Sequence, residues 1–125
     1  MVVYSLAGRA DDPFFAQVED LASYISAELP DISIKKYMVH PEDWASFYAD
    51  TTKKLGFVYR PLDVLIWTDT GRLIGDQNDF SAHCHEYYKA KIKEPFETYV
   101  KIAEENMASA TFLKKEGKVP KVEGL

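Results

Sequence analysis

The stretch Gly8-Arg9-Ala10-Asp11-Asp12-Pro13-Phe14-Phe15 decides the fold, because it joins an apolar strand to an amphipathic helix. The run Val2–Ala7 predicts a β-strand that ends at Gly8, and Asp12 followed by Pro13 is a typical helix start with the carboxylate as N-cap. In α/β folds the carboxyl end of the first strand faces a helix N-terminus, and chemistry or anion binding usually lies there. Here that position holds a carboxylate, a proline and two phenylalanines, with no thiol and no hydroxyl.

Helix and strand patterns alternate after this turn. Apolar residues at helical spacing predict a helix from Pro13 to Leu29, and Pro30-Asp31 stops it. The segment Ile32–Val39 predicts a second strand. A second helix begins at His40-Pro41, and Gly56 ends it. Its apolar stripe consists of Trp44, Phe47, Tyr48, Thr51 and Leu55.

The second half of the chain predicts a hairpin and two more helices. Val64–Trp67 is the strongest strand signal, and Asp69–Arg72 turns it into the short strand Leu73–Ile74. A helix from Phe80 to Lys91, capped by Asp79, and a last helix starting at Pro95 follow. We therefore expect one domain over residues 1–113 and a polar tail over 114–125 that is solvated or ordered only on a partner.

Composition limits the class of protein. A chain of 125 residues with 46% hydrophobic residues is long enough for one buried core. The net charge of −5 argues against a nucleic-acid partner, and no apolar run approaches the length of a membrane span. A single cysteine, Cys84, allows neither an internal disulfide nor a CxxC pair. With no signal-peptide pattern at the N-terminus, a cytoplasmic protein is the expectation.

The element order β-α-β-α-β-β-α-α predicts an α/β fold with a four-stranded mixed sheet. Right-handed crossovers place the first strand centrally, with helices on both faces. This is the thioredoxin-like or glutaredoxin-like architecture, extended here by an extra C-terminal helix.

Several segments resemble the N-terminal glutaredoxin-like domain of the malate dehydrogenase 1B family. The likeness spans most of residues 4 to 110 and is carried by the shared order of Tyr4–Ala16, Leu29–Ile32, Pro41–Trp44, Leu65–Trp67, Asn78–Phe80, Glu86–Tyr88 and Ala103–Asn106. The resemblance implies a protein associated with ciliated cells. Family members carry a dehydrogenase domain after this one, yet no GxGxxG occurs here, so NAD binding does not carry over. The chain is either a stand-alone relative or the amino-terminal portion of one.

The resemblance places the chain's own Asp12-Pro13-Phe14-Phe15 where a glutaredoxin has Cys-Pro-Tyr-Cys. A carboxylate cannot perform thiol–disulfide exchange, so no catalytic residue is predicted at this degenerate turn. Glutathione binding is disfavoured as well, because Val64 stands where the cis-proline is expected, with Pro61 the nearest proline. The turn Gly75–Asp79 keeps only part of the pattern that holds the γ-glutamyl end. No cofactor is predicted.

The His83-Cys84-His85 segment invites a metal interpretation. Two histidines two residues apart on a helix point in nearly opposite directions, so they cannot bind one ion together. No metal site is predicted, and Cys84 is interpreted as a small buried hydrophobe.

Adjacent aromatic residues cannot both point inward, so Phe14 or Phe15, and Tyr87 or Tyr88, must be exposed. We therefore predict a surface for protein–protein interaction around Arg9, Phe14, Phe15 and Tyr88. The resulting hypothesis is a non-catalytic interaction or structural module in a ciliary or flagellar axonemal assembly, with axonemal or microtubule-associated proteins as partners. A regulatory domain of a malate-dehydrogenase-like oxidoreductase and a glutathione-binding protein remain alternatives.

Overall fold

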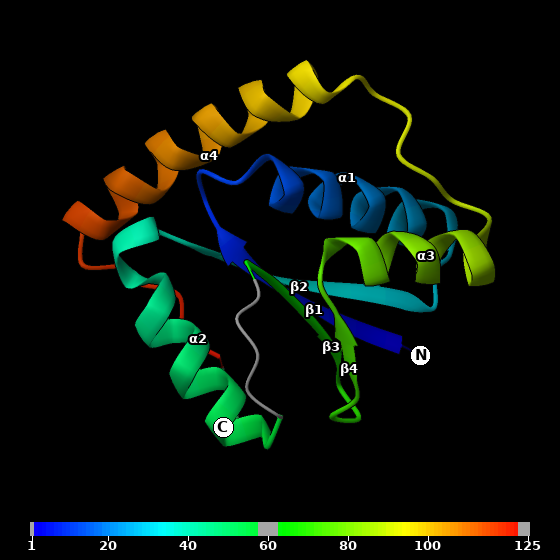
Figure 1. The fold of residues 1–125 in the computed structure, drawn as a ribbon, viewed down its shortest axis with the longest axis horizontal. Coiled ribbons are helices and arrows are strands. Elements are labelled where there is room, and N and C mark those ends of the chain that lie inside the picture. The colour runs from blue at the N-terminus through cyan, green and yellow to red at the C-terminus, as the bar shows by residue number, and fades with distance from the viewer. Residues whose placement is uncertain (1, 58–62, 123–125) are drawn as a thin grey trace.

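Each predicted strand and helix is present in the computed structural model, which describes residues 2–57 and 63–122 (Figure 1). The elements in chain order are β1 (Val2–Arg9), α1 (Pro13–Glu28), β2 (Ile32–Val39), α2 (Pro41–Leu55), β3 (Val64–Thr68), β4 (Leu73–Gly75), α3 (Gln77–Tyr88) and α4 (Phe96–Lys115). No described helix is both long and apolar enough to cross a membrane.

The sheet has the strand order β2-β1-β3-β4. β1 pairs in parallel with β2 and antiparallel with β3, and β3 pairs antiparallel with β4. α1 and α3 lie side by side on one face of the sheet, α2 lies on the other face, and α4 runs over α1 as an outer layer (Figure 1). The central first strand, the antiparallel pair and the extra helix are confirmed, and the fold is thioredoxin-like.

Two hydrophobic clusters hold the layers together. The larger cluster lies between the sheet and the α1/α3 layer and includes Leu6, Phe15, Val18, Ile25, Ile66, Phe80 and Cys84. The smaller cluster lies under α2 and consists of Ala7, Tyr37, Val39, Trp44, Tyr48, Leu65 and Trp67. Alternate residues of β1 and β3 supply both clusters, as expected for a sheet covered on both faces.

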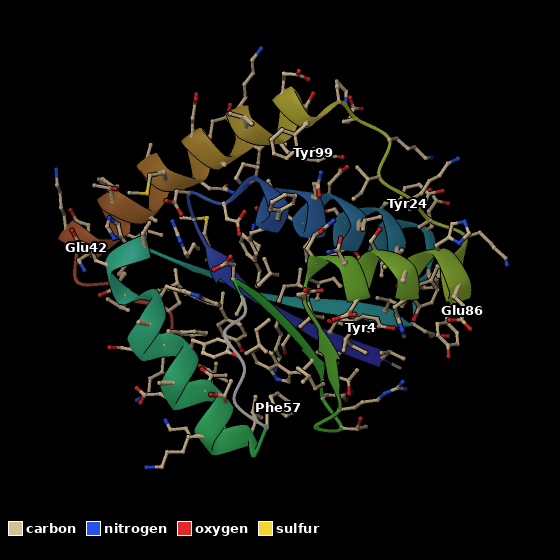
Figure 2. The ribbon with its side chains drawn as sticks, viewed as in Figure 1. Tyr4, Tyr24, Glu42, Phe57, Glu86 and Tyr99 are labelled. Carbon is tan, nitrogen blue, oxygen red and sulfur yellow. The ribbon has the colours of Figure 1, made fainter. Side chains whose placement is uncertain are left out.

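Polar bonds fix α4 against the domain. The buried Tyr99 hydroxyl donates to the Asp20 carboxylate of α1 at 2.8 Å, with Tyr99 visible between the two helices in Figure 2. At the other end of α4, the Lys114 ammonium lies 2.9 Å from an Asp43 carboxylate oxygen on α2. α4 continues to Lys115, past residue 114, where the polar tail was predicted to begin, and Val122 packs against the smaller cluster.

Some element ends differ from the prediction. α3 spans Gln77–Tyr88 instead of residues 80–91, because Asp76 rather than Asp79 is its N-cap. Asp76 and Asp79 form a capping box, in which each side chain accepts a bond from the other's backbone N–H. The helix ends at Lys89, whose φ of 56° is left-handed. Pro61, named above only as the proline nearest to Val64, lies outside the described residues.

Candidate functional site

The turn after β1 is built by backbone bonds and one helix cap. The Ala10 N–H donates to the Val39 carbonyl at 2.8 Å, which keeps the end of β1 beside β2. The Asp12 carboxylate accepts from the Phe14 N–H at 2.9 Å, and Pro13 occupies the first turn of α1. Asp12 is therefore the helix cap that the sequence predicts. The Arg9 guanidinium makes two bonds to the Asp11 carboxylate, of 3.0 and 2.9 Å.

The two adjacent phenylalanines point in opposite directions. Phe14 is 48% exposed, and its ring lies against Phe96 of α4 with centroids 5.7 Å apart; Phe96 is 46% exposed. We call Phe14 and Phe96 the aromatic pair. Phe15 is fully buried in the larger cluster, so it is a core residue and not the contact residue predicted from the sequence. The sequence did not point to Phe96 as a surface residue, because its helical spacing to Tyr99 and Ala103 places it on the apolar stripe of the last helix.

A hollow of about 340 Å³ adjoins the aromatic pair where β3, α1 and α3 begin. Its lining residues are Asp12, Phe14, Asp63, Val64, Asp76, Gln77 and Asn78, and we call it the acidic hollow. The three sequence positions compared with a glutathione site (residues 12–15, Val64 and 75–79) therefore lie together. Asp63 and Asp76 were not predicted as site residues. The sequence offered one signal for these two residues: Asp63 directly precedes β3 and Asp76 directly precedes α3, and both elements begin at the end of the sheet where α1 begins.

Negative charge is concentrated in this hollow. Burial raises the pKa of Asp12, and the nearby carboxylates of Asp63 and Asp11 add to the effect. The Phe14 N–H and Arg9 oppose the shift. No Lys or Arg is among the described residues that line the acidic hollow. A cationic group is the chemistry that such a site accommodates best.

A second hollow of about 280 Å³ lies between the turn and α4. Its lining is largely apolar and consists of Asp11, Pro13, Val100, Ala103, Glu104 and Met107. The aromatic pair and the two hollows form one surface at the N-terminal end of α1, which we call the turn surface.

Cys84 lies away from the turn surface, in the larger cluster between α3 and the sheet. It is fully buried, and burial raises the pKa of its thiol to about 12. The thiolate, which is the reactive form, is therefore scarce at neutral pH.

We expect the native protein to react with a thiol reagent such as dithionitrobenzoate at least about a hundredfold more slowly than the urea-unfolded protein. The reason is that the native thiol is both inaccessible and protonated. Absorbance at neutral pH measures the release of thionitrobenzoate. Equal rates in the native and unfolded states would show that Cys84 is open to solvent.

The two histidines of α3 lie in different environments. His83 Nε2 is 2.8 Å from the Tyr4 hydroxyl, which is also bonded to the Tyr88 hydroxyl, while His85 is exposed. Tyr88, predicted as a contact residue, is half-buried in this network. Within residues 2–57 and 63–122, no group of three or more His, Cys, Asp or Glu residues is placed to hold a metal ion.

The free energy of unfolding should fall as the pH drops below the ordinary histidine pKa of about 6.5. The pKa of His83 is lowered, chiefly by burial and also by Arg72, with Glu86 opposing the shift. The unfolded chain then binds more protons than the folded one. The stability that neutral His83 contributes is therefore fully present above about pH 6.5, and it is lost as the pH falls to the lowered pKa of the folded state. Urea unfolding at about pH 7.5 and about pH 5 should show a smaller change in the free energy of unfolding for His83→Gln than for the unchanged protein. The control His85→Gln should behave like the unchanged protein, and equal pH effects in both variants would contradict this assignment.

Comparison with known proteins gives one consistent result. Residues 3–121 match the family model described as "Putative malate dehydrogenase 1B N-terminal domain". The chain is similar to proteins named "Putative malate dehydrogenase 1B" from Bos taurus (33% identical) and Homo sapiens (31% identical), with 100% and 87% of the chain covered. A protein of the same name from Branchiostoma floridae is 30% identical over 93% of the chain.

The aligned part is a small share of those relatives. It covers 27% of the bovine, 22% of the human and 23% of the Branchiostoma protein, so the chain spans about a quarter of their length. The match nevertheless extends over nearly the whole domain, including the degenerate turn and α4. The chain therefore belongs to the family described as the putative malate dehydrogenase 1B N-terminal domain.

Proposed function

We propose that this domain is a non-catalytic protein-interaction module, and that it serves as a subunit of a ciliary or flagellar axonemal assembly. The observation that carries the interaction role is the aromatic pair. Two phenylalanines from different helices contact each other and stay nearly half exposed at the turn where a glutaredoxin would hold its thiol. Exposed aromatic residues in such a cluster are typical anchors of protein interfaces.

The chemistry of the turn supports a role without catalysis. The group in the position of the nucleophile is the Asp12 carboxylate, which is engaged as a helix cap. Cys84 is buried in the core with a raised pKa, so it does not replace the missing thiol at the turn. What remains at this site is shape, apolar area and charge.

The axonemal part of the proposal rests on the family resemblance alone. The resemblance implies an association with ciliated cells, and axonemal or microtubule-associated proteins are the corresponding partners. The relatives' own names refer to malate dehydrogenase 1B and add nothing about cilia.

Affinity purification of the tagged protein from ciliated and non-ciliated cells tests both parts. We expect axonemal proteins to be recovered from ciliated cells with the unchanged protein and to be lost with Phe14→Ser. Phe112→Ser is the matched control, because Phe112 is 63% exposed on α4 outside the turn surface. Recovery of the same partners with Phe14→Ser would reject the interaction site. Recovery of the same partners from both cell types would reject the axonemal placement.

A second candidate is the regulatory N-terminal domain of a malate-dehydrogenase-like oxidoreductase. The observation in its favour is that the chain corresponds to only about a quarter of its relatives' length. Transcript sequencing would support this candidate if the reading frame continued beyond residue 125 into a glycine-rich strand–turn–helix segment. The decisive measurement is then malate oxidation by that longer protein with and without residues 1–113.

Glutathione binding is the weakest alternative. The acidic hollow occupies the relevant position, and glutathione is itself an anion at neutral pH, so charge repulsion disfavours the complex. Titration calorimetry with glutathione should give no saturable heat, and a saturable signal would overturn this conclusion.

A further inference from the structure

The turn surface combines apolar contact area with negatively charged side chains. The aromatic pair supplies exposed rings, and the hollow beside α4 adds the apolar side chains of Pro13, Val100 and Met107. The acidic hollow, which Phe14 also lines, supplies the carboxylates of Asp12, Asp63 and Asp76. A ligand that covers the rings therefore also meets the carboxylates.

The described residues do not neutralise these carboxylates. Asp12 and Asp76 each use one carboxylate oxygen to cap a helix. The Asp63 carboxylate makes no hydrogen bond or ion pair with any described residue. Arg9 is close enough to interact with Asp12 and Asp63, but its guanidinium is already bonded to Asp11. Among the described residues, the surface therefore keeps a net negative charge beside its apolar part.

Resting on the interaction role proposed above, we infer that the turn surface binds a partner-protein segment with an apolar residue next to a lysine or arginine. The apolar side chain packs on the aromatic pair, and the cationic side chain enters the acidic hollow. Charge complementarity selects this occupant over an acidic or neutral segment. It also disfavours a second copy of this chain, which carries a net charge of −5.

The ¹⁵N-labelled full chain, titrated with a capped hexapeptide that alternates leucine with lysine or arginine, tests the inference by NMR. We expect saturable shifts of the amides of Phe14, Val64 and Gln77. Asp63→Asn should weaken binding about threefold, as expected for the loss of one exposed ion pair. Asp31→Asn, which removes an exposed carboxylate from the loop between α1 and β2, is the matched control and should leave the affinity unchanged.

Three further arms separate the explanations. A peptide with every cation replaced by glutamine should bind at least about tenfold more weakly, and about 0.5 M salt should weaken the cationic peptide as well. Equal binding of the neutral peptide would overturn the charge inference and leave the aromatic interaction role standing. Equal binding of spermine would show a charge effect without protein docking. Absence of saturable shifts at the turn, or self-association of the chain through this surface, would overturn the inference outright.

Discussion

Replacing Phe15 by alanine should lower the free energy of unfolding by about 3–5 kcal/mol, while replacing the adjacent Phe14 should cost about 1 kcal/mol or less. The two residues have the same side chain and neighbouring positions in the first turn of α1. Phe15 is fully buried in the larger cluster, and Phe14 is 48% exposed. Truncation therefore leaves a cavity in the first case and removes only a surface contact with Phe96 in the second.

Urea unfolding followed by far-UV circular dichroism measures both costs. A domain of this size typically has a total stability of about 5–15 kcal/mol, so Phe15→Ala removes a large part of it. Phe15→Leu keeps most of the volume and should retain a measurable transition if the alanine variant does not fold. Similar costs for Phe14→Ala and Phe15→Ala would mean that the two rings are not divided between surface and core.

Substitutions at Phe14 and Phe15 should affect different properties: those at Phe14 affect partner binding, and those at Phe15 affect stability. Phe14→Ser should lose partners without losing the fold, because the Phe14 ring is part of the turn surface and is 48% exposed. A loss of binding in a well-folded Phe14→Ser variant is therefore attributable to the surface itself. The same loss in a Phe15 variant would carry no such meaning.

The fold was predictable from the sequence because its signals are local and mutually consistent. Alternating strand and helix patterns gave the element order, and the handedness of crossovers then placed β1 at the centre of the sheet. The Asp12 cap followed from a residue type and its spacing to Pro13. The start of α3 was misassigned because both Asp76 and Asp79 are good N-caps, and the reciprocal capping box favours the earlier one.

The site was only partly predictable, because it depends on contacts between distant segments. The sequence showed that one of Phe14 and Phe15 must be exposed, yet nothing local decides which one. Phe96 joins Phe14 only because α4 packs across α1, a tertiary contact that helical periodicity does not report. The acidic hollow likewise requires Asp63 and Asp76 to meet Asp12 across the edge of the sheet.

Gly8→Ala is expected to destabilise the protein by about 1–3 kcal/mol, although alanine is ordinarily preferred over glycine within a strand. A Cβ at residue 8 would lie 2.4 Å from Phe15 Cδ1 and 2.7 Å from Phe15 Cγ, well inside contact distance. The backbone cannot move away, because Gly8 pairs with Met38 of β2 on one side and Val64 of β3 on the other. The Phe15 ring is also enclosed by the larger cluster.

A double-mutant cycle in urea tests this contact directly. If the clash with the ring is the cause, Gly8→Ala combined with Phe15→Ala should cost at least about 1 kcal/mol less than the sum of the single changes. Additive costs would place the strain of Gly8→Ala in the strand backbone instead. In that case glycine at the end of β1 would reflect the pairing of the sheet. A coupled result would mean that glycine is required at residue 8 because the buried Phe15 ring leaves no room for a Cβ there.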